Sequence, residues 1–150
     1  MSIIPQWNSS TLLGTSTERF FQAHVSYIYY VSMFNISDRN LKTNIKPLSG
    51  ELAINSLKRL NGYTYDYKPE VFKNAQKEME GMLLESGKNQ IGVMAQELKE
   101  VFPQLVKQDE KTQQLSVNYI GLIPILIESI KEQQKQIEEL KLLVTQLQQK

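Results

Sequence analysis

Few side chains in the sequence could carry out covalent chemistry, and one pair of them stands at a spacing that allows a reaction. There is no cysteine and a single histidine, so disulfides, thiolate zinc sites, cysteine nucleophiles and multi-histidine metal sites are excluded. Among the serines, only Ser37 is followed five positions later by a lysine, Lys42. A neutral lysine amine can accept the proton of a serine hydroxyl and so activate it as a nucleophile. The spacing allows a Ser/Lys dyad, although Ser-Asp before a polar run more often forms a turn or a helix cap.

Length, composition and charge favour one small globular domain. The chain has 150 residues, of which 41% are hydrophobic, enough for one core but not for two large domains. It carries 17 basic and 16 acidic residues, and this balance gives no general attraction for nucleic acid. Residues 20–37 lack charged side chains, but Gln22, His24 and Asn35 interrupt the run. We therefore expect neither nucleic acid nor a membrane as a partner, and we expect His24 to be packed or solvated.

Three zones of different composition follow one another. In residues 1–36, the segment 25–31 (VSYIYYV) has the aromatic and β-branched density of a strand. Because such an uncharged strand is prone to aggregate alone, we expect it to pair with other copies or with β-structure upstream. Residues 37–122 have the pattern of a small α+β core, and residues 123–150 show a seven-residue repeat. The predicted fold class is α+β, with a β-structured lead and a long C-terminal coiled-coil helix.

Periodicity predicts the elements of the middle zone. Apolar residues at helical spacing over 48–60 predict a helix that ends at Asn61-Gly62. The alternation YTYDY over 63–67 predicts a strand, and its tyrosines are more typical of cross-strand packing than of a stacking platform. Further predictions are a long polar excursion or an irregular helix over 68–89, and a short strand at 91–93. They continue with a helix at 95–101 stopped by Pro103 and a hairpin joining 105–106 to 115–117.

The last zone has the pattern of a coiled coil. Heptad positions a and d are occupied by Ile123, Leu126, Ile130, Gln133, Ile137, Leu140, Val144 and Leu147, with Gln133 as the polar exception. β-Branched residues at a with Leu at d favour two strands, whereas Ile127 at e and Leu143 at g widen the apolar face, so two and three strands both stay open. A helix folded back on its own domain is the alternative. Pro124 predicts a break or kink, with residues 119–123 forming a separate turn.

Five segments, taken in order, resemble the C-terminal intramolecular chaperone domain of phage tailspikes and tail fibres. This is the peptidase S74 family, which includes the endosialidase chaperone. The segments are 37–45 (SDRNLKTNI), 57–65 (LKRLNGYTY), 91–98 (IGVMAQEL) with 101–103 (VFP), 117–119 (VNY) and 126–133 (LIESIKEQ). The segment 13–20 (LGTSTERF) is similar to a repeat that often ends the β-structured fibre just upstream.

The resemblance implies a parallel homotrimer that brings three fibre chains into register and then cuts itself off. Ser37 matches the nucleophile of the family and Lys42 its general base, while Asp38 and Arg39 belong to the same motif as possible support. No cofactor or metal is implied, and the implied partner is the upstream fibre region of the same chain. Assembly in the host cytoplasm is implied, with the fibre part in the virion tail. Residues 1–36 would be the end of the stalk, 37–122 the chaperone core and 123–150 the coil.

Ring size predicts which bond such a serine would cut. The Ser37 hydroxyl reaches the carbonyl of Ile36 through a five-membered ring, whereas its own carbonyl would need a strained four-membered one. Cleavage is therefore expected between Ile36 and Ser37, with the bond after Ser37 as the alternative if another protomer supplies the nucleophile. Lys42 must be neutral to act, which requires burial or a nearby positive charge such as that of Arg39.

Two other functions are compatible with these residues. A permanent oligomerisation module would keep the coil and never cut, and a fibre-tip adhesin would bind glycan through the aromatic lead, which includes Trp7. Intact mass separates cutting from permanent assembly, because loss of residues 1–36 would remove roughly 4 kDa of the 17.3 kDa chain.

Overall fold

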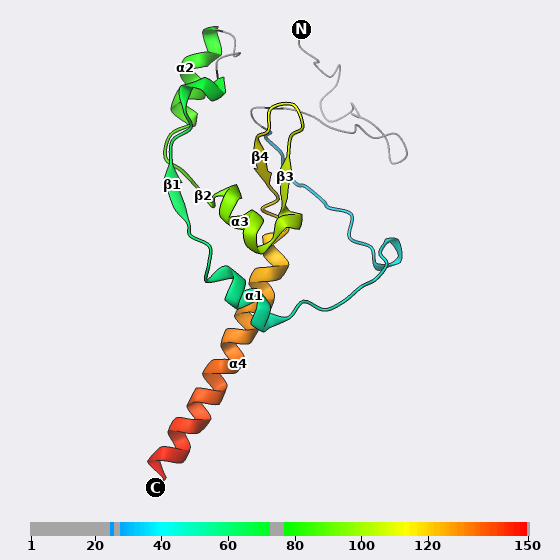
Figure 1. Cartoon of the computed structure of the whole chain (residues 1–150), viewed down its shortest axis with the longest axis vertical. Helices are drawn as coiled ribbons and strands as arrows, with labels where there is room; N and C mark the ends of the chain where they lie inside the picture. Colours follow the sequence, from blue (N-terminus) through cyan, green and yellow to red (C-terminus); the bar gives the residue numbers. More distant parts are fainter. Residues whose placement is uncertain (1–24, 26–27, 73–76, 150) are drawn as a thin grey trace. The chain divides into compact units, whose positions relative to one another are not determined.

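The computed structural model describes residues 25, 28–72 and 77–149 (Figure 1). The chain divides into two compact units, Met1–Asn44 and Ile45–Lys150. In the described part, the first unit holds one 3-10 turn, η1 (Arg39–Leu41), and the second holds four α-helices and two small antiparallel sheets. The mixed α+β content predicted for the chain is confirmed. No helix in the described ranges is long and apolar enough to cross a membrane.

The strand predicted for the segment 25–31 is not found in its described residues. Residue 25 and residues 28–31 form no ladder, and the side chains of Val31 and Phe34 are fully open to solvent. A strand is stable only when its backbone groups pair with a neighbouring strand. The described residues of this segment therefore form no strand in the single chain, and their pairing with other copies stays a prediction. Trp7, His24 and the segment 13–20 lie outside the described residues.

Three helices of the second unit meet in a small apolar core. α1 (Gly50–Leu57), α3 (Ala95–Val101) and α4 (Leu122–Gln148) each bury one side of their surface there. The buried members of the cluster are Ala53, Leu98, Leu105 and Ile125. Leu98 is its centre, with 0% of its surface exposed. The predicted helix at 95–101 is confirmed at both ends, and the one at 48–60 is confirmed as a shorter helix.

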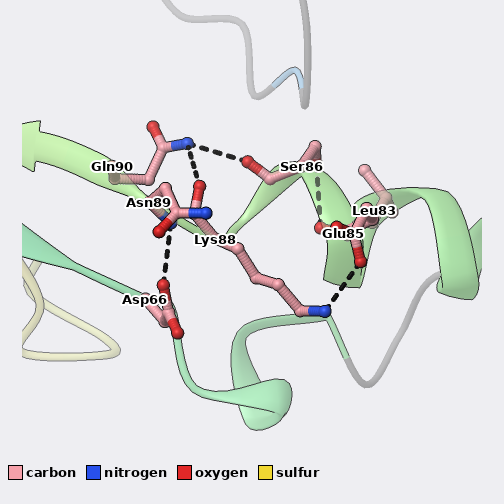
Figure 2. Close-up of polar contacts among 7 residues, drawn as sticks. All are labelled: Asp66, Leu83, Glu85, Ser86, Lys88, Asn89 and Gln90. Atoms are coloured by element: carbon pink, nitrogen blue, oxygen red, sulfur yellow. Dashed lines mark hydrogen bonds and ion pairs between the residues drawn. The ribbon is translucent and has the colours of Figure 1, made fainter.

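A two-stranded sheet carries the polar excursion at its far end. β1 (Tyr63–Tyr65) pairs antiparallel with β2 (Gln90–Gly92), and between them the chain forms η2 (Pro69–Phe72) and α2 (Lys77–Ser86). Figure 2 shows how the return path is fixed: the backbone N–H of Asn89 donates to Asp66 Oδ1 at 2.7 Å, and the Gln90 amide donates to the Ser86 carbonyl at 2.8 Å. The described part of the excursion therefore contains a helix, and hydrogen bonds tie its end to β1 and β2.

The predicted hairpin is present and leads into the long helix. After η3 (Pro103–Leu105), β3 (Val106–Gln108) pairs antiparallel with β4 (Leu115–Val117). The Asn118 N–H donates to the Leu105 carbonyl at 2.8 Å, and its Oδ1 accepts from the Gly121 N–H at 3.1 Å. These two bonds fix the direction in which the chain enters α4.

The break predicted at Pro124 is absent. α4 runs from Leu122 to Gln148 without interruption, and Pro124 is its third residue. The first turn of a helix has N–H groups with no partner inside the helix, so a proline there removes no hydrogen bond. The turn predicted at 119–123 is only partly correct, because the Leu122 N–H already donates to the Tyr119 carbonyl at 3.1 Å as the helix begins.

Candidate functional site

The residues 37–42 form a single tight turn in the first unit. Asp38 stands at the N-cap of η1, where its Oδ1 accepts a hydrogen bond from the Asn40 N–H at 2.9 Å. The Lys42 N–H donates to the Arg39 carbonyl at 3.1 Å and ends the turn. Asp38 thus has a structural part in this motif: its carboxylate satisfies a backbone donor at the start of the turn.

The turn returns the Lys42 side chain to Ser37. Lys42 Nζ donates to Ser37 Oγ at 2.7 Å and to the Ser37 carbonyl oxygen at 3.2 Å. The nucleophile and the base predicted from sequence are therefore in direct hydrogen-bond contact, within the distance that proton transfer requires. Because both anchors of the amine belong to one residue, its nitrogen stays beside the hydroxyl oxygen.

Both members of this pair are exposed to solvent in the single chain. The ammonium form of lysine is a donor only, so the amine must lose its proton before it can act as a base. Ile36, whose carbonyl lies on the N-terminal side of Ser37, is also 66% exposed. The arrangement therefore has the contacts of a Ser/Lys dyad, while in the single chain its members are open to water.

Asn44 separates this turn from the second unit. Its φ angle of 53° lies in the left-handed region, which asparagine tolerates better than most residues. The boundary between the two compact units falls directly after it. The left-handed backbone at this position therefore explains why an asparagine stands at 44 in the segment 37–45.

The heptad face of α4 is exposed along its whole length. Its seven apolar members have 45–71% of their surface exposed: Ile123, Leu126, Ile130, Ile137, Leu140, Val144 and Leu147. The domain covers a neighbouring stripe instead, where Ile125 and Ser129 are buried at 4% exposure each. The first half of α4 therefore packs on its own domain, as the alternative of a folded-back helix predicts, while most of the heptad face stays open to solvent. An apolar stripe of this length, interrupted at Gln133, is the kind of surface that a coiled coil buries.

α1 is the helix that lies against α4, as Figure 1 shows. The two backbones approach closely at Gly50, where a Cβ would lie 3.0 Å from the Glu128 carbonyl oxygen and 3.0 Å from Glu132 Cβ. Only a residue without a side chain fits this approach comfortably. No local pattern predicts this approach, because the contact joins positions far apart in the chain.

Several residues in the motif segments have structural roles that sequence reasoning missed. Tyr119 Oη accepts a hydrogen bond from the Val93 N–H at 3.2 Å, and a Cβ at Gly92 would overlap the same oxygen. The segments 91–98 and 117–119 are therefore in contact. Tyr65 and Tyr67 pack edge to face with their ring centroids 5.4 Å apart. A hydrogen bond with Tyr67 together with burial raises the pKa of Tyr65 to about 12.

Glu97 joins the α1–β1 connection to α3. Its Oε1 accepts from the Tyr63 hydroxyl at 2.5 Å, and its Oε2 accepts from the Asn61 N–H at 3.3 Å. The hydrogen bond from Tyr63 lowers the pKa of the Glu97 carboxyl, and the same bond raises the pKa of Tyr63. This contact places the segment 57–65 on the segment 91–98 and is a structural feature of the core, not part of the Ser37 turn.

Comparisons with known proteins agree with this arrangement. Residues 37–107 match the family model described as the chaperone of endosialidase, peptidase S74. The chain is also 32% identical over 107 residues to the long tail fiber protein Gp37 of Enterobacteria phage K3 and to that of Enterobacteria phage T2. Each alignment covers 69% of this chain but only 8% of the K3 protein and 7% of the T2 protein. The matched family region begins at Ser37 itself.

Proposed function

This chain carries a domain of the peptidase S74 family, the chaperone of endosialidase, and from that premise we propose that it registers three copies of a tail-fibre segment and then cuts itself free beside Ser37. The observation that carries the proposal is the 2.7 Å hydrogen bond between Lys42 Nζ and Ser37 Oγ. The fibre part is inferred from the tail fibre relatives, of which this chain spans less than a tenth.

The proposed reaction is an acyl shift followed by hydrolysis. Neutral Lys42 takes the hydroxyl proton as Ser37 Oγ attacks the carbonyl carbon of Ile36 through a five-membered ring. The tetrahedral intermediate collapses when its C–N bond breaks, and Lys42 returns the proton to the departing amine of Ser37. The ester that joins the Ile36 carbonyl to Ser37 Oγ then reacts with water, which leaves a carboxylate on Ile36 and restores the hydroxyl. Each chain reacts once.

Assembly is proposed to switch the reaction on. A lysine amine in water is charged at neutral pH, and Lys42 and Ser37 are both exposed in the single chain. Covering the turn with a surface from another copy would disfavour the ammonium form and exclude bulk water. Cutting would then report that the copies have come together, and chains that fail to assemble would keep their fibre attached.

The exposed heptad face of α4 supports the assembly half of the proposal. Pairing three extended chains in parallel is slow and can slip, because loop-closure entropy is lost before any contact forms. A coil at one end of the chain raises the local concentration of the three strands. Three copies are proposed over two because Ile127 and Leu143, 47% and 55% exposed, extend the apolar face beyond the width that a two-stranded seam covers.

Ser37→Ala tests the cutting directly. The wild-type chain should give a product smaller by roughly 4 kDa, corresponding to residues 1–36, whereas Ser37→Ala should stay at the full 17.3 kDa and still assemble. Ser32→Ala is the matched control, because Ser32 is another exposed serine of the lead. A Ser37→Ala chain that is cut like wild type overturns the assignment of the nucleophile.

The mass also separates the proposal from its main rival. A wild-type chain that assembles but keeps its full mass would be a permanent trimerisation module. A product that begins after Ser37 would mean that the nucleophile acts from another copy.

A further inference from the structure

A groove lies between α1 and the first half of α4, at the edge of the heptad face. It has a volume of about 300 Å³, and one side of it is lined by Ile54 of α1 and by Lys58, the residue that caps the C-terminus of α1. The other side is formed by α4, where the heptad residues Ile130 and Gln133 lie next to Ser129. The groove therefore joins the surface that the domain covers to the face left open for a coiled coil.

Ser129 is the unexplained residue of this groove. It is 4% exposed, and its Oγ is buried without a hydrogen-bond partner among the described residues. Buried hydroxyl groups nearly always have a partner, since nothing else offsets the loss of water. Because Ser129 lines the groove, a polar group that enters the groove is the candidate for its missing hydrogen bond.

Heptad geometry identifies what a second helix would bring to this place. With Ile130 at position a, Ser129 is at g. In a parallel coil, a g residue faces the e residue that stands five positions later in the neighbouring helix. For Ser129 that residue is Gln134, which is exposed in the single chain.

We propose that this groove is the docking site for Gln134 of a second copy of the chain, an inference that rests on the proposed function because it requires the coil to form. The Gln134 amide nitrogen donates to Ser129 Oγ, and its carbonyl oxygen accepts from Lys58 Nζ at the rim. α1 thereby becomes part of the interface between copies, and each groove is complete only when another chain fills it.

The proposed contact also selects the register. A slip of one heptad would bring Ile127 or Lys141 to the groove in place of Gln134. Ile127 cannot pair with a hydroxyl, and Lys141 would meet the positive charge of Lys58. Of these three successive e residues, only Gln134 offers both a donor and an acceptor without charge. A slipped coil would leave Ser129 unpaired, which disfavours it.

Cross-linking tests the proposal in the full chain, which has no cysteine of its own. The double variant Lys58→Cys with Gln134→Cys should form covalent trimers on a non-reducing denaturing gel after mild oxidation. The matched control is Lys58→Cys with Lys141→Cys, which moves the second thiol one heptad along the same stripe and should give little cross-linked product. Sedimentation under reducing conditions, run on both variants, reports assembly independently.

The outcomes separate this inference from the function on which it rests. Chains that sediment as trimers without a 58–134 link, or that link 58 to 141 more readily, overturn the groove assignment and leave the trimeric chaperone intact. Chains that sediment as monomers overturn both. Links formed within one chain would also contradict the proposal.

A coupling measurement gives a second readout that needs no cysteine. Ser129→Ala and Gln134→Ala should each raise the trimer dissociation constant by about 5-fold, and the double variant should be little worse than either single one. If Ser129 acts only within its own chain, removing its unpaired hydroxyl should instead leave the trimer unchanged or strengthen it.

Discussion

The two halves of α4 lie in different surroundings although they share one heptad pattern. In the first half, Ile125 and Ser129 are buried against the domain while the heptad residues beside them stay exposed. In the second half, every described residue from 133 to 149 is exposed. The heptad pattern thus continues beyond the point at which the domain can explain it.

This difference separates the surface of α4 that stabilises the fold of one chain from the surface that is proposed for assembly. An amphipathic helix gains most of its stability from packing its apolar stripe. The first half has such packing within one chain, whereas the apolar stripe of the second half has none in the described structure. Substitutions in the two halves should therefore have separable effects.

A charge in the second half should have the largest effect on assembly. Leu140→Asp would place three carboxylates at one level of the coil and raise the trimer dissociation constant by at least ~100-fold. Sedimentation equilibrium measures this constant. The circular dichroism of the core should change little, because Leu140 is 61% exposed in the single chain. A Leu140→Asp protein that remains trimeric would contradict the role given to the second half.

A cavity in the first half should affect the fold of the single chain. Ile125→Ala, made in the Leu140→Asp background, should lower the free energy of unfolding by about 2–5 kcal/mol. Ile137→Ala in the same background is the matched control, and it should change that free energy by less than about 0.5 kcal/mol because its site is exposed. Denaturant unfolding measures both. Equal losses from the two variants would erase the distinction between the halves.

The polar heptad residue near the junction should have a smaller effect, in the stabilising direction. Gln133→Leu should strengthen the trimer by about 1 kcal/mol per chain, because a buried amide in a coil costs stability. Thermal melting at several protein concentrations measures the change. Without the polar residue, the coil should be less selective for three strands, so sedimentation should show a mixture of oligomers. A weaker trimer would show that the three Gln133 side chains stabilise each other.

The smallest predicted effect concerns the part-buried hydrogen bond between Tyr63 and Glu97, and it should not depend on assembly. Tyr63→Phe removes the hydrogen bond that holds the pKa of Glu97 below 4.5, so that pKa should rise toward its ordinary value. In wild type, the pKa of Glu97 is lower in the folded chain than in the unfolded chain. The stabilisation from this hydrogen bond is therefore fully present above the unfolded-state pKa and is lost as the pH falls through the folded-state pKa. Titration followed by NMR measures the shift. The same shift should appear in Leu140→Asp, and a shift that depends on the trimer would contradict a purely intrachain contact.

The elements that sequence predicts well here are set by local features. The helix Ala95–Val101 follows from its own apolar spacing and from Pro103. The contact between Lys42 and Ser37 likewise depends on one short turn. The spacing of five residues allows this contact, but only the resemblance to the peptidase S74 family singles out these two residues. In both cases, the residues that make the structure lie close together in the sequence.

The predictions that failed depend on what lies elsewhere. Residues 28–31 have strand composition, but a strand also requires a paired neighbour, and composition does not supply one. Pro124 breaks a helix only if the helix starts well before it, and the start at Leu122 is set by the packing of the preceding turn. The groove at Ser129 could not be predicted at all, because it exists only where α1 lies on α4.

Assembly through the second half of α4 is proposed to switch on cutting beside Ser37. The intact mass of the Leu140→Asp chain, measured beside wild type after identical expression, tests this coupling. Wild type should be cut into fragments of roughly 4 and 13 kDa, while the Leu140→Asp chain should keep its 17.3 kDa. A Leu140→Asp chain that is monomeric and yet cut to the same extent would show that cutting does not require assembly.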